Sequence, residues 1–211
     1  MAAGGSAGRP YRRIATEEAW ISPELLALYQ KMLKDGSADD PGFDSLWRHY
    51  GLGMSERCIA VRERMLDLGD RRIGDMDAAG IDMQILLLTT PGVQLLDAET
   101  AVALAAVSND QVGQAVQTHP DRFAALAAIA PQAPQAAAKE LERAVTRLKL
   151  KGAVINSHSR GEYLDDRKFW PIFEAAEALR ADLCSSQHAA ARDDRTAAGA
   201  RPRRGDLRIR G

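Results

Sequence analysis

The sequence has 211 residues, which is enough for one substantial domain. Its 28 Lys and Arg and 29 Asp and Glu residues give a net charge of −1, whereas a nucleic-acid-binding protein normally carries a basic excess on one face. No segment reaches the roughly 20 consecutive apolar residues that span a bilayer, and no apolar signal segment is visible at the N-terminus. Cys58 and Cys184 form neither a disulfide framework nor a zinc motif. These features favour a cytoplasmic protein that binds neither nucleic acid nor membrane.

The first part of the chain predicts one short strand and a helix. Residues 1–10 are small and flexible and predict a disordered lead-in. Residues 13–16 predict a brief strand, which Glu17 and Glu18 end. Residues 23–34 carry leucines at helical spacing, and a stretch rich in Gly, Ser, Asp and Pro breaks that helix.

From residue 55 onward, helices and strands are predicted in regular alternation. Ser55 is a typical helix N-cap, and the helix after it ends at Gly69. Residues 83–88 (MQILLL) form an unbroken apolar run, as expected of a strand buried on both faces. The remaining patterns predict helices at 71–79, 99–118, 134–149 and 166–179, and strands at 122–130 and 152–155.

This alternation predicts an α/β fold with parallel strands and right-handed crossovers. No glycine-rich phosphate-binding motif follows any predicted strand, which excludes the phosphate-loop types of open sheet. A closed (β/α)8 barrel begins with the same alternation but typically needs about 250 residues. The four predicted βα units match the N-terminal half of such a barrel, so we expect a partial barrel domain over residues 11–179.

The last segment, residues 180–211, has a different composition. It contains eight Arg and four Asp but no Lys or Glu, and few large apolar residues. Because it cannot bury enough surface to offset its ordering entropy, we expect a disordered tail outside the family pattern. A basic tail that binds RNA or acidic lipid is the alternative, but the Arg residues are interspersed with Asp rather than grouped in a block.

In a barrel, catalytic groups lie at the C-terminal ends of the strands, and several polar residues follow predicted strands here. Glu17 or Glu18 can bind a divalent metal through a carboxylate oxygen, or the two form an ordinary exposed acidic pair. Residues 89–92 fit a simple turn. His158 follows the strand at 152–155, either as a base or ligand or as a structural histidine.

The segment between the first two strands contains aromatic residues and an arginine. Arg57, near the aromatic residues of 46–50, can grip a carboxylate because its guanidinium is planar and forked, or it is a surface helix residue. Cys58 in the same helix fits a buried small residue better than a nucleophile. The residues by themselves therefore predict an α/β domain with a candidate metal site.

Several motifs between residues 11 and 179 occur together in a fixed order. They are Arg13–Ala19 (RIATEEA), Ser45–Trp47 (SLW), Ser55–Arg57 (SER), Leu66–Ile73 (LDLGDRRI), Asp75–Asp82 (DMDAAGID), Thr90–Gln94 (TPGVQ), His119–Phe123 (HPDRF) and Ile155–His158 (INSH). This set resembles the amidohydrolase-superfamily (amidohydrolase 2) decarboxylases of aromatic acids, which include the 5-carboxyvanillate and γ-resorcylate decarboxylases.

The resemblance implies a (β/α)8 barrel with one divalent metal, Mn²⁺ or Zn²⁺, that catalyses non-oxidative decarboxylation of a hydroxylated benzoate. By position, Glu17 matches the metal ligand of the first strand, and Arg57, with Tyr50, matches residues that reach the carboxylate of the small aromatic substrate. Ala19 stands where hydrolytic relatives have a second histidine, which favours a carboxy-lyase over a hydrolase of lactones or amides. Family members are homo-oligomers.

The resemblance also implies that no catalytic residue lies within this chain. The family's acid, an Asp of the last strand, and the assisting His would come later than residue 179. Where the family has a strand ending in L-x-H-P, this sequence has Ser186 at the histidine position and His188 two places later. We expect a truncated chain that switches reading frame after about residue 179, and an inactive, non-catalytic fragment is therefore a further alternative.

Overall fold

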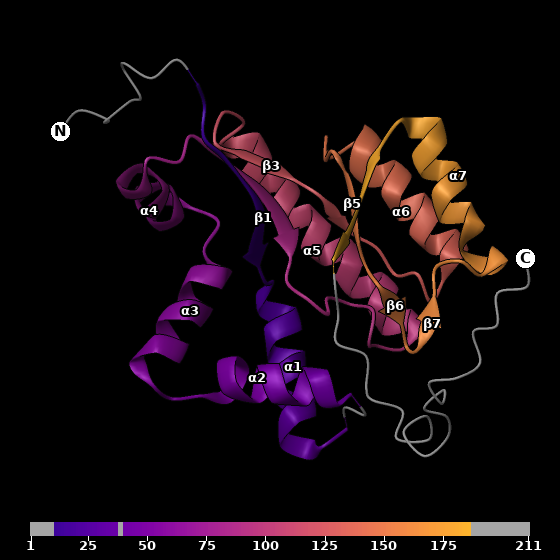
Figure 1. Cartoon of the computed structure of the whole chain (residues 1–211), viewed down its shortest axis with the longest axis horizontal. Helices are drawn as coiled ribbons and strands as arrows, with labels where there is room; N and C mark the ends of the chain where they lie inside the picture. The colour runs from indigo at the N-terminus through magenta and orange to yellow at the C-terminus, as the bar shows by residue number, and fades with distance from the viewer. Residues whose placement is uncertain (1–10, 38–39, 187–211) are drawn as a thin grey trace, which may run out of the picture.

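Parallel strands and helices alternate along most of the chain in the computed structural model, which describes residues 11–37 and 40–186 (Figure 1). The main strands are β1 (Ile14–Trp20), β2 (Met83–Leu88), β3 (Phe123–Ala125), β4 (Ala127–Ala128), β5 (Gly152–Asn156) and β8 (Asp182–Ser186). They form two three-stranded parallel groups, β1-β2-β3 and β4-β5-β8. The backbone N–H of Leu126, between β3 and β4, donates to Leu86 of β2 at 2.9 Å and so connects the two groups.

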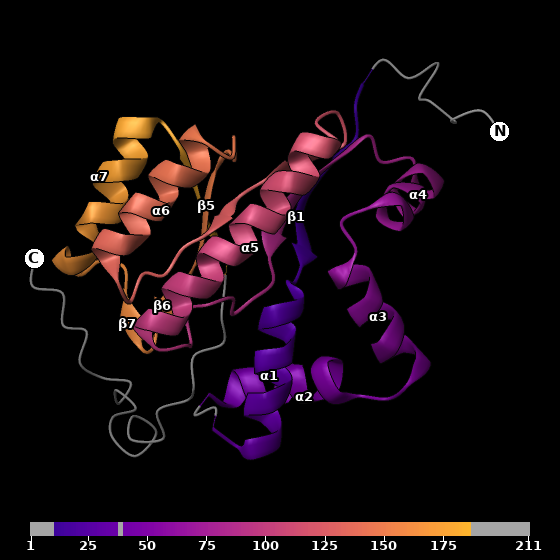
Figure 2. The same ribbon diagram turned by 180° about the vertical axis from the view of Figure 1, so that it is seen from behind.

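The helices divide into two sets. The first set consists of α1 (Pro23–Asp35), α2 (Pro41–Leu52), α3 (Glu56–Leu66) and α4 (Asp70–Ala79), and the second of α5 (Ala98–Thr118), α6 (Pro134–Thr146) and α7 (Trp170–Leu179), the last preceded by a 3₁₀ turn at Arg167–Phe169. Figures 1 and 2 show α5, α6 and α7 side by side against the sheet, whereas α1 to α4 gather beyond and beside β1. No helix among the described residues is long and apolar enough to cross a membrane.

Apolar side chains on the two faces of the sheet belong to separate clusters. Leu86 and Leu88 of β2 pack into the large core that includes the helices. Leu87 instead joins a small cluster with Leu126 and Val154, against which Ile85 and Cys184 pack. Because side chains alternate along a strand, the large core is the helix-covered outer layer and the small cluster is the inner face of a partial barrel. The predicted α/β half-barrel is therefore confirmed.

The structure contains one helix that the sequence pattern did not predict, and one strand where a disordered tail was expected, so the expected disorder is wrong for residues 182–186. The expected break after α1 is present, since α1 ends at Asp35. The unpredicted helix α2 begins after it because the Asp40 side chain accepts from Phe43 N–H at 2.7 Å and Pro41 occupies the first helical position. Strand β8 lies within the expected tail and pairs in parallel with β5, from Gly152 opposite Asp182 onward. The rest of that tail, residues 187–211, and the expected lead-in 1–10 lie outside the described residues.

Several other boundaries follow the sequence pattern closely. Strand β2 covers the predicted range, and Ser55 caps α3 by accepting from Cys58 N–H at 3.3 Å. Gly80 ends α4 with φ 67°, a left-handed conformation that glycine adopts without steric cost. The strand predicted at 13–16 instead continues to Trp20, so Glu17 and Glu18 lie inside β1 rather than at its end.

Candidate functional site

The loops that follow β2 and β5 are joined by hydrogen bonds at the C-terminal ends of the strands. Asn156, which is 5% exposed, donates through Nδ2 to Pro91 O at 2.7 Å and accepts from Thr90 Oγ1 at 3.3 Å. Its backbone N–H donates to Gln94 Oε1 at 2.6 Å. These contacts fix the two loops relative to each other.

Gln94 also holds the hairpin formed by β6 (His158–Ser159) and β7 (Glu162–Tyr163). Its Nε2 donates to Ser159 Oγ at 2.7 Å and to His158 O at 3.2 Å. The His158 ring is buried, accepts from Gly161 N–H at 3.4 Å and lies 6.0 Å from the Tyr163 ring. The structure thus buries His158 in the first strand of this hairpin.

Side chains of α1 and α2 hold the loop after β2 from the other side. Trp47 Nε1 donates to Thr90 O at 3.1 Å, and the Tyr29 hydroxyl donates to Gly92 O. Complete burial, together with the nearby charge of Asp40, raises the pKa of Tyr29 well above its usual value. The loop at 89–92 is therefore more than a simple turn, because two helices and β5 all bind it.

Glu17 lies at an irregularity in β1. The register with β2 shifts between Ala15 and Glu18, and Glu17 has φ 58°. The Glu17 side chain is exposed. Glu18 pairs with Leu86, whose side chain faces the helix layer, and accepts from Gln84 Nε2 at 3.2 Å. The two adjacent carboxylates thus have different surroundings: Glu17 is exposed, and Glu18 is half-buried.

The other two predicted site residues lie on the helices beyond β1. Arg57 is exposed in the first turn of α3, and Tyr50 is half-buried in α2, with its ring 4.8 Å from that of His49. Arg62 donates to Tyr50 O at 2.8 Å and to Gly53 O at 2.6 Å, which ties the end of α2 to α3. Among the described residues, no hydrogen bond or ion pair brings Arg57 or Tyr50 to Glu17.

The described residues contain no complete set of metal ligands. Within residues 11–37 and 40–186, no three side chains of His, Cys, Asp or Glu come together in a group able to hold a metal ion. Cys58 is buried with its Sγ 3.6 Å from His49 Nε2, in agreement with its predicted structural role. The described residues therefore do not bring together the three protein ligands that a catalytic zinc site takes, or the four of a structural one.

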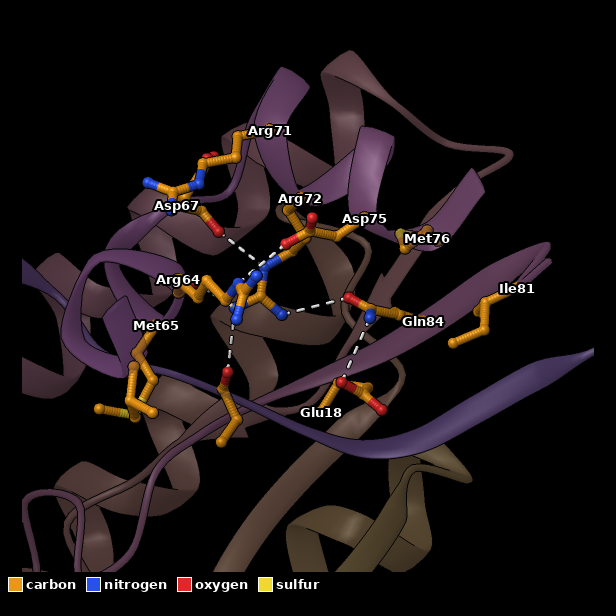
Figure 3. Close-up of a pocket in the computed structure, with 12 residues that line it drawn as sticks. Glu18, Arg64, Met65, Asp67, Arg71, Arg72, Asp75, Met76, Ile81 and Gln84 are labelled. Atoms are coloured by element: carbon orange, nitrogen blue, oxygen red, sulfur yellow. Dashed lines mark hydrogen bonds and ion pairs between the residues drawn. The ribbon is translucent and has the colours of Figure 1, made fainter. Parts of the chain in front are cut away.

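A cavity of about 400 Å³ on the helix side of β1 was not anticipated (Figure 3). It is lined by β1, β2, α3, α4 and the segments that connect them, through Glu18, Ala19, Val61, Arg64, Met65, Asp67, Arg71, Arg72, Asp75, Met76, Ile81 and Gln84. Arg72, only 9% exposed, borders it, and burial lowers the pKa of its guanidinium. Two sequence signals pointed to Arg72: it belongs to the Leu66–Ile73 motif, and it lies four residues before Met76 on the face of α4 that is buried.

Comparisons with known proteins agree with this fold. Residues 60–204 match the family model described as Amidohydrolase. The chain is 39% identical over 126 residues to gamma-resorcylate decarboxylase of Polaromonas sp., covering 56% of this chain and 39% of that protein. It is 34% identical over 174 residues to gamma-resorcylate decarboxylase of Rhizobium radiobacter, covering 79% and 47%.

A solved structure gives the same result. The crystal structure of 5-carboxyvanillate decarboxylase from Novosphingobium aromaticivorans, complexed with manganese and 4-hydroxy-3-methoxy-5-nitrobenzoic acid, is 48% identical with a TM-score of 0.79. The match covers 82% of this chain and 49% of that one. The chain belongs to the amidohydrolase family, as its motifs predicted, and it spans about half the length of these relatives or less.

Proposed function

We propose that this chain contributes the β1 side of the active site of a metal-dependent decarboxylase that acts on a hydroxylated benzoate without oxidation. The observation that carries the proposal is Glu17, an exposed carboxylate at the β1 irregularity in a chain 48% identical to a manganese-complexed 5-carboxyvanillate decarboxylase. In this proposal Glu17 binds the divalent metal, Mn²⁺ or Zn²⁺, and Arg57 and Tyr50 bind the substrate's carboxylate.

The position of Arg57 supports a binding role. Arg57 lies in the first turn of α3, where the partial positive charge of the helix N-terminus disfavours a cation. The side chain is exposed and therefore available to a ligand. An arginine there does little for helix stability, whereas it can bind a carboxylate through two parallel hydrogen bonds. Replacing it with lysine (Arg57→Lys) would chiefly raise KM, and an unchanged KM would remove Arg57 from the site.

The metal ligands present are incomplete. A carboxylate such as Glu17 suits a hard divalent cation, but the described residues bring no second and third ligand beside it. The same observation favours a second candidate function, a non-catalytic chain without metal-dependent turnover. A hydrolase of lactones or amides is disfavoured by Ala19, which stands where hydrolytic relatives have a histidine.

Release of CO₂ from 5-carboxyvanillate and γ-resorcylate, measured with the full chain in the presence of Mn²⁺, separates these functions. A decarboxylase releases CO₂, loses that activity in Glu17→Gln and keeps it in the matched control Glu18→Gln. Hydrolysis of an aromatic lactone without CO₂ release would instead support the hydrolase.

If the chain releases no CO₂, a graft separates a non-catalytic family member from a wrong assignment of the site. Residues 11–186 would replace the matching half of the Novosphingobium enzyme, which is 48% identical. Turnover in the graft that depends on Glu17 but not on Glu18 would support the proposed ligand. If Glu17→Gln left the turnover of the grafted enzyme unchanged, Glu17 would not be a metal ligand. Size-exclusion chromatography with light scattering tests the homo-oligomer that the family resemblance predicts.

A further inference from the structure

The backbone of Glu17 adopts a conformation that its side chain disfavours. Its φ of 58° lies in the left-handed region, where a residue with a Cβ pays a steric penalty that glycine avoids. Non-glycine residues keep such a conformation only when the surrounding structure enforces it, and such residues cluster at functional sites. Something around β1 must therefore hold Glu17 in place.

The conformation accompanies one extra residue in β1. Ala15 pairs with Gln84 and Glu18 with Leu86, so β1 advances three residues while β2 advances two. This is a β-bulge, a feature that redirects a side chain and is common next to active sites. The extra residue lies between Ala15 and Glu18, where Glu17 has its positive φ.

Arg72 holds β1 immediately after the bulge in two ways, directly through Ala19 and indirectly through Gln84 and Glu18. Arg72 Nη2 donates to Ala19 O at 3.0 Å, and Nη1 donates to Gln84 Oε1 at 3.1 Å. Gln84 Nε2 in turn donates to Glu18 Oε2 at 3.2 Å (Figure 3). Because the backbone of Gln84 pairs with Ala15, Gln84 contacts β1 on both sides of the bulge.

Arg72 itself is rigidly placed. Its Nε donates to Asp67 O at 2.6 Å and its Nη2 also donates to Arg64 O at 2.8 Å, which ties the guanidinium to the end of α3 and to the segment before α4. It is 9% exposed, and Gln84 is 7% exposed. A planar guanidinium with several fixed donors can hold these carbonyls at once, which a lysine ammonium cannot.

We infer that Arg72 is a positioning residue that, through Ala19 and Gln84, holds Glu17 in its left-handed backbone conformation. The importance of Glu17 as a metal ligand rests on the proposed function, whereas the coupling between Arg72 and residue 17 does not. The guanidinium of Arg72 is thus engaged by protein oxygen atoms of β1, β2 and the segment from α3 to α4.

The test compares glycine and alanine at position 17 in the full chain by equilibrium urea unfolding. Both substitutions remove the carboxylate, so their difference reports the backbone alone. At a left-handed residue Glu17→Gly is more stable than Glu17→Ala, by a factor of about 5 in the unfolding equilibrium constant. At an ordinary strand position the order reverses, by a factor of about 2 to 5.

The same pair is then measured in an Arg72→Lys background. Lys keeps the charge but has one nitrogen, which cannot reach Ala19, Gln84 and Asp67 together. We expect the order of stability to reverse, because residue 17 relaxes to an ordinary strand conformation. If Arg72 were merely structural, both variants would lose equal stability and the order would stay the same, which would overturn the inference.

Two further backgrounds complete the test. Arg64→Met is the matched control, since Arg64 lines the same cavity but its side chain pairs with Asp75 at 3.1 Å and is 59% exposed. It should keep glycine more stable than alanine. Gln84→Leu removes the hydrogen bond to Glu18, so we expect Glu17→Ala to become more stable than Glu17→Gly in that background. This second background tests the inference if Arg72→Lys does not fold. If Glu17→Ala were more stable than Glu17→Gly while Arg72 and Gln84 are intact, the inference would also be overturned. None of these measurements involves metal or substrate, so they test the inference independently of the proposed function.

Discussion

The loop network at the ends of β2 and β5 and the bulge in β1 are both built from polar residues, but they differ in burial. Asn156 and Gln94 are 5% and 4% exposed, and their side chains join neighbouring loops through hydrogen bonds. Glu17 is exposed and has a strained backbone. Buried, satisfied polar groups stabilise a fold, whereas an exposed carboxylate held in a costly conformation is available for chemistry. Substitutions should therefore cost stability in the first region and function in the second.

The largest effect is expected for Asn156→Ala. It leaves Pro91 O, inside a buried network, without its donor, and we expect a loss of about 2–3 kcal/mol in the free energy of unfolding. Urea unfolding measures this loss. The control Gln111→Ala removes an exposed hydrogen bond to Glu24 and should change the free energy by less than about 0.5 kcal/mol. Equal losses in the two variants would contradict the contrast between the regions.

The loop network should also respond to alkaline pH through Tyr29. Burial raises the pKa of Tyr29, so the folded protein retains a proton that the unfolded chain releases near pH 10. Its contribution to stability is complete below about pH 10 and is lost as pH rises toward the higher pKa of the folded state. Urea midpoints between pH 8 and pH 11 would show a decline that is smaller in Tyr29→Phe. An identical decline in both proteins would contradict this role.

A smaller effect is expected for Trp47→Phe. It removes the hydrogen bond from Nε1 to Thr90 O while keeping an aromatic ring in the core, so we expect a loss of about 1 kcal/mol. Trp170→Phe is the matched control, because Trp170 is 50% exposed. If the two variants unfolded at the same urea concentration, the bond from α2 to the loop after β2 would not contribute to stability.

The smallest effect on stability is expected at the bulge itself. Glu17→Gln keeps the size of an exposed side chain, so the free energy of unfolding should change by less than about 0.5 kcal/mol. The same variant should abolish any metal-dependent CO₂ release. A stability loss comparable with that of Asn156→Ala would place Glu17 with the structural network instead.

The sequence predicted the regular elements well where local signals were unambiguous. The apolar run of β2, the Ser55 N-cap of α3 and the Gly80 C-cap of α4 all lie where expected. Helix α2 was missed because Asp40 and Pro41 suit both a loop and a helix start, and the choice between them depends on Phe43 and Trp47 being buried against Tyr29. Strand β8 was missed because it depends on tertiary contacts, namely its pairing with β5 and the packing of Leu183 and Cys184 against the two apolar clusters.

The sequence alone determined the alternating α/β pattern and the family motifs, because periodicity and motif order are local properties of the chain. The selection of Glu17 as a metal ligand followed from the family resemblance and stays a prediction. Only the tertiary structure decided that Glu17 lies in a bulge, that Glu18 faces the helix layer and that Arg72 reaches both β1 and β2. A one-residue shift in register changes which face every later side chain occupies, and no local pattern encodes that shift. Strand pairing and packing therefore decide that Glu17 is exposed and that Glu18 contacts Gln84, although the two residues are identical and adjacent in the sequence.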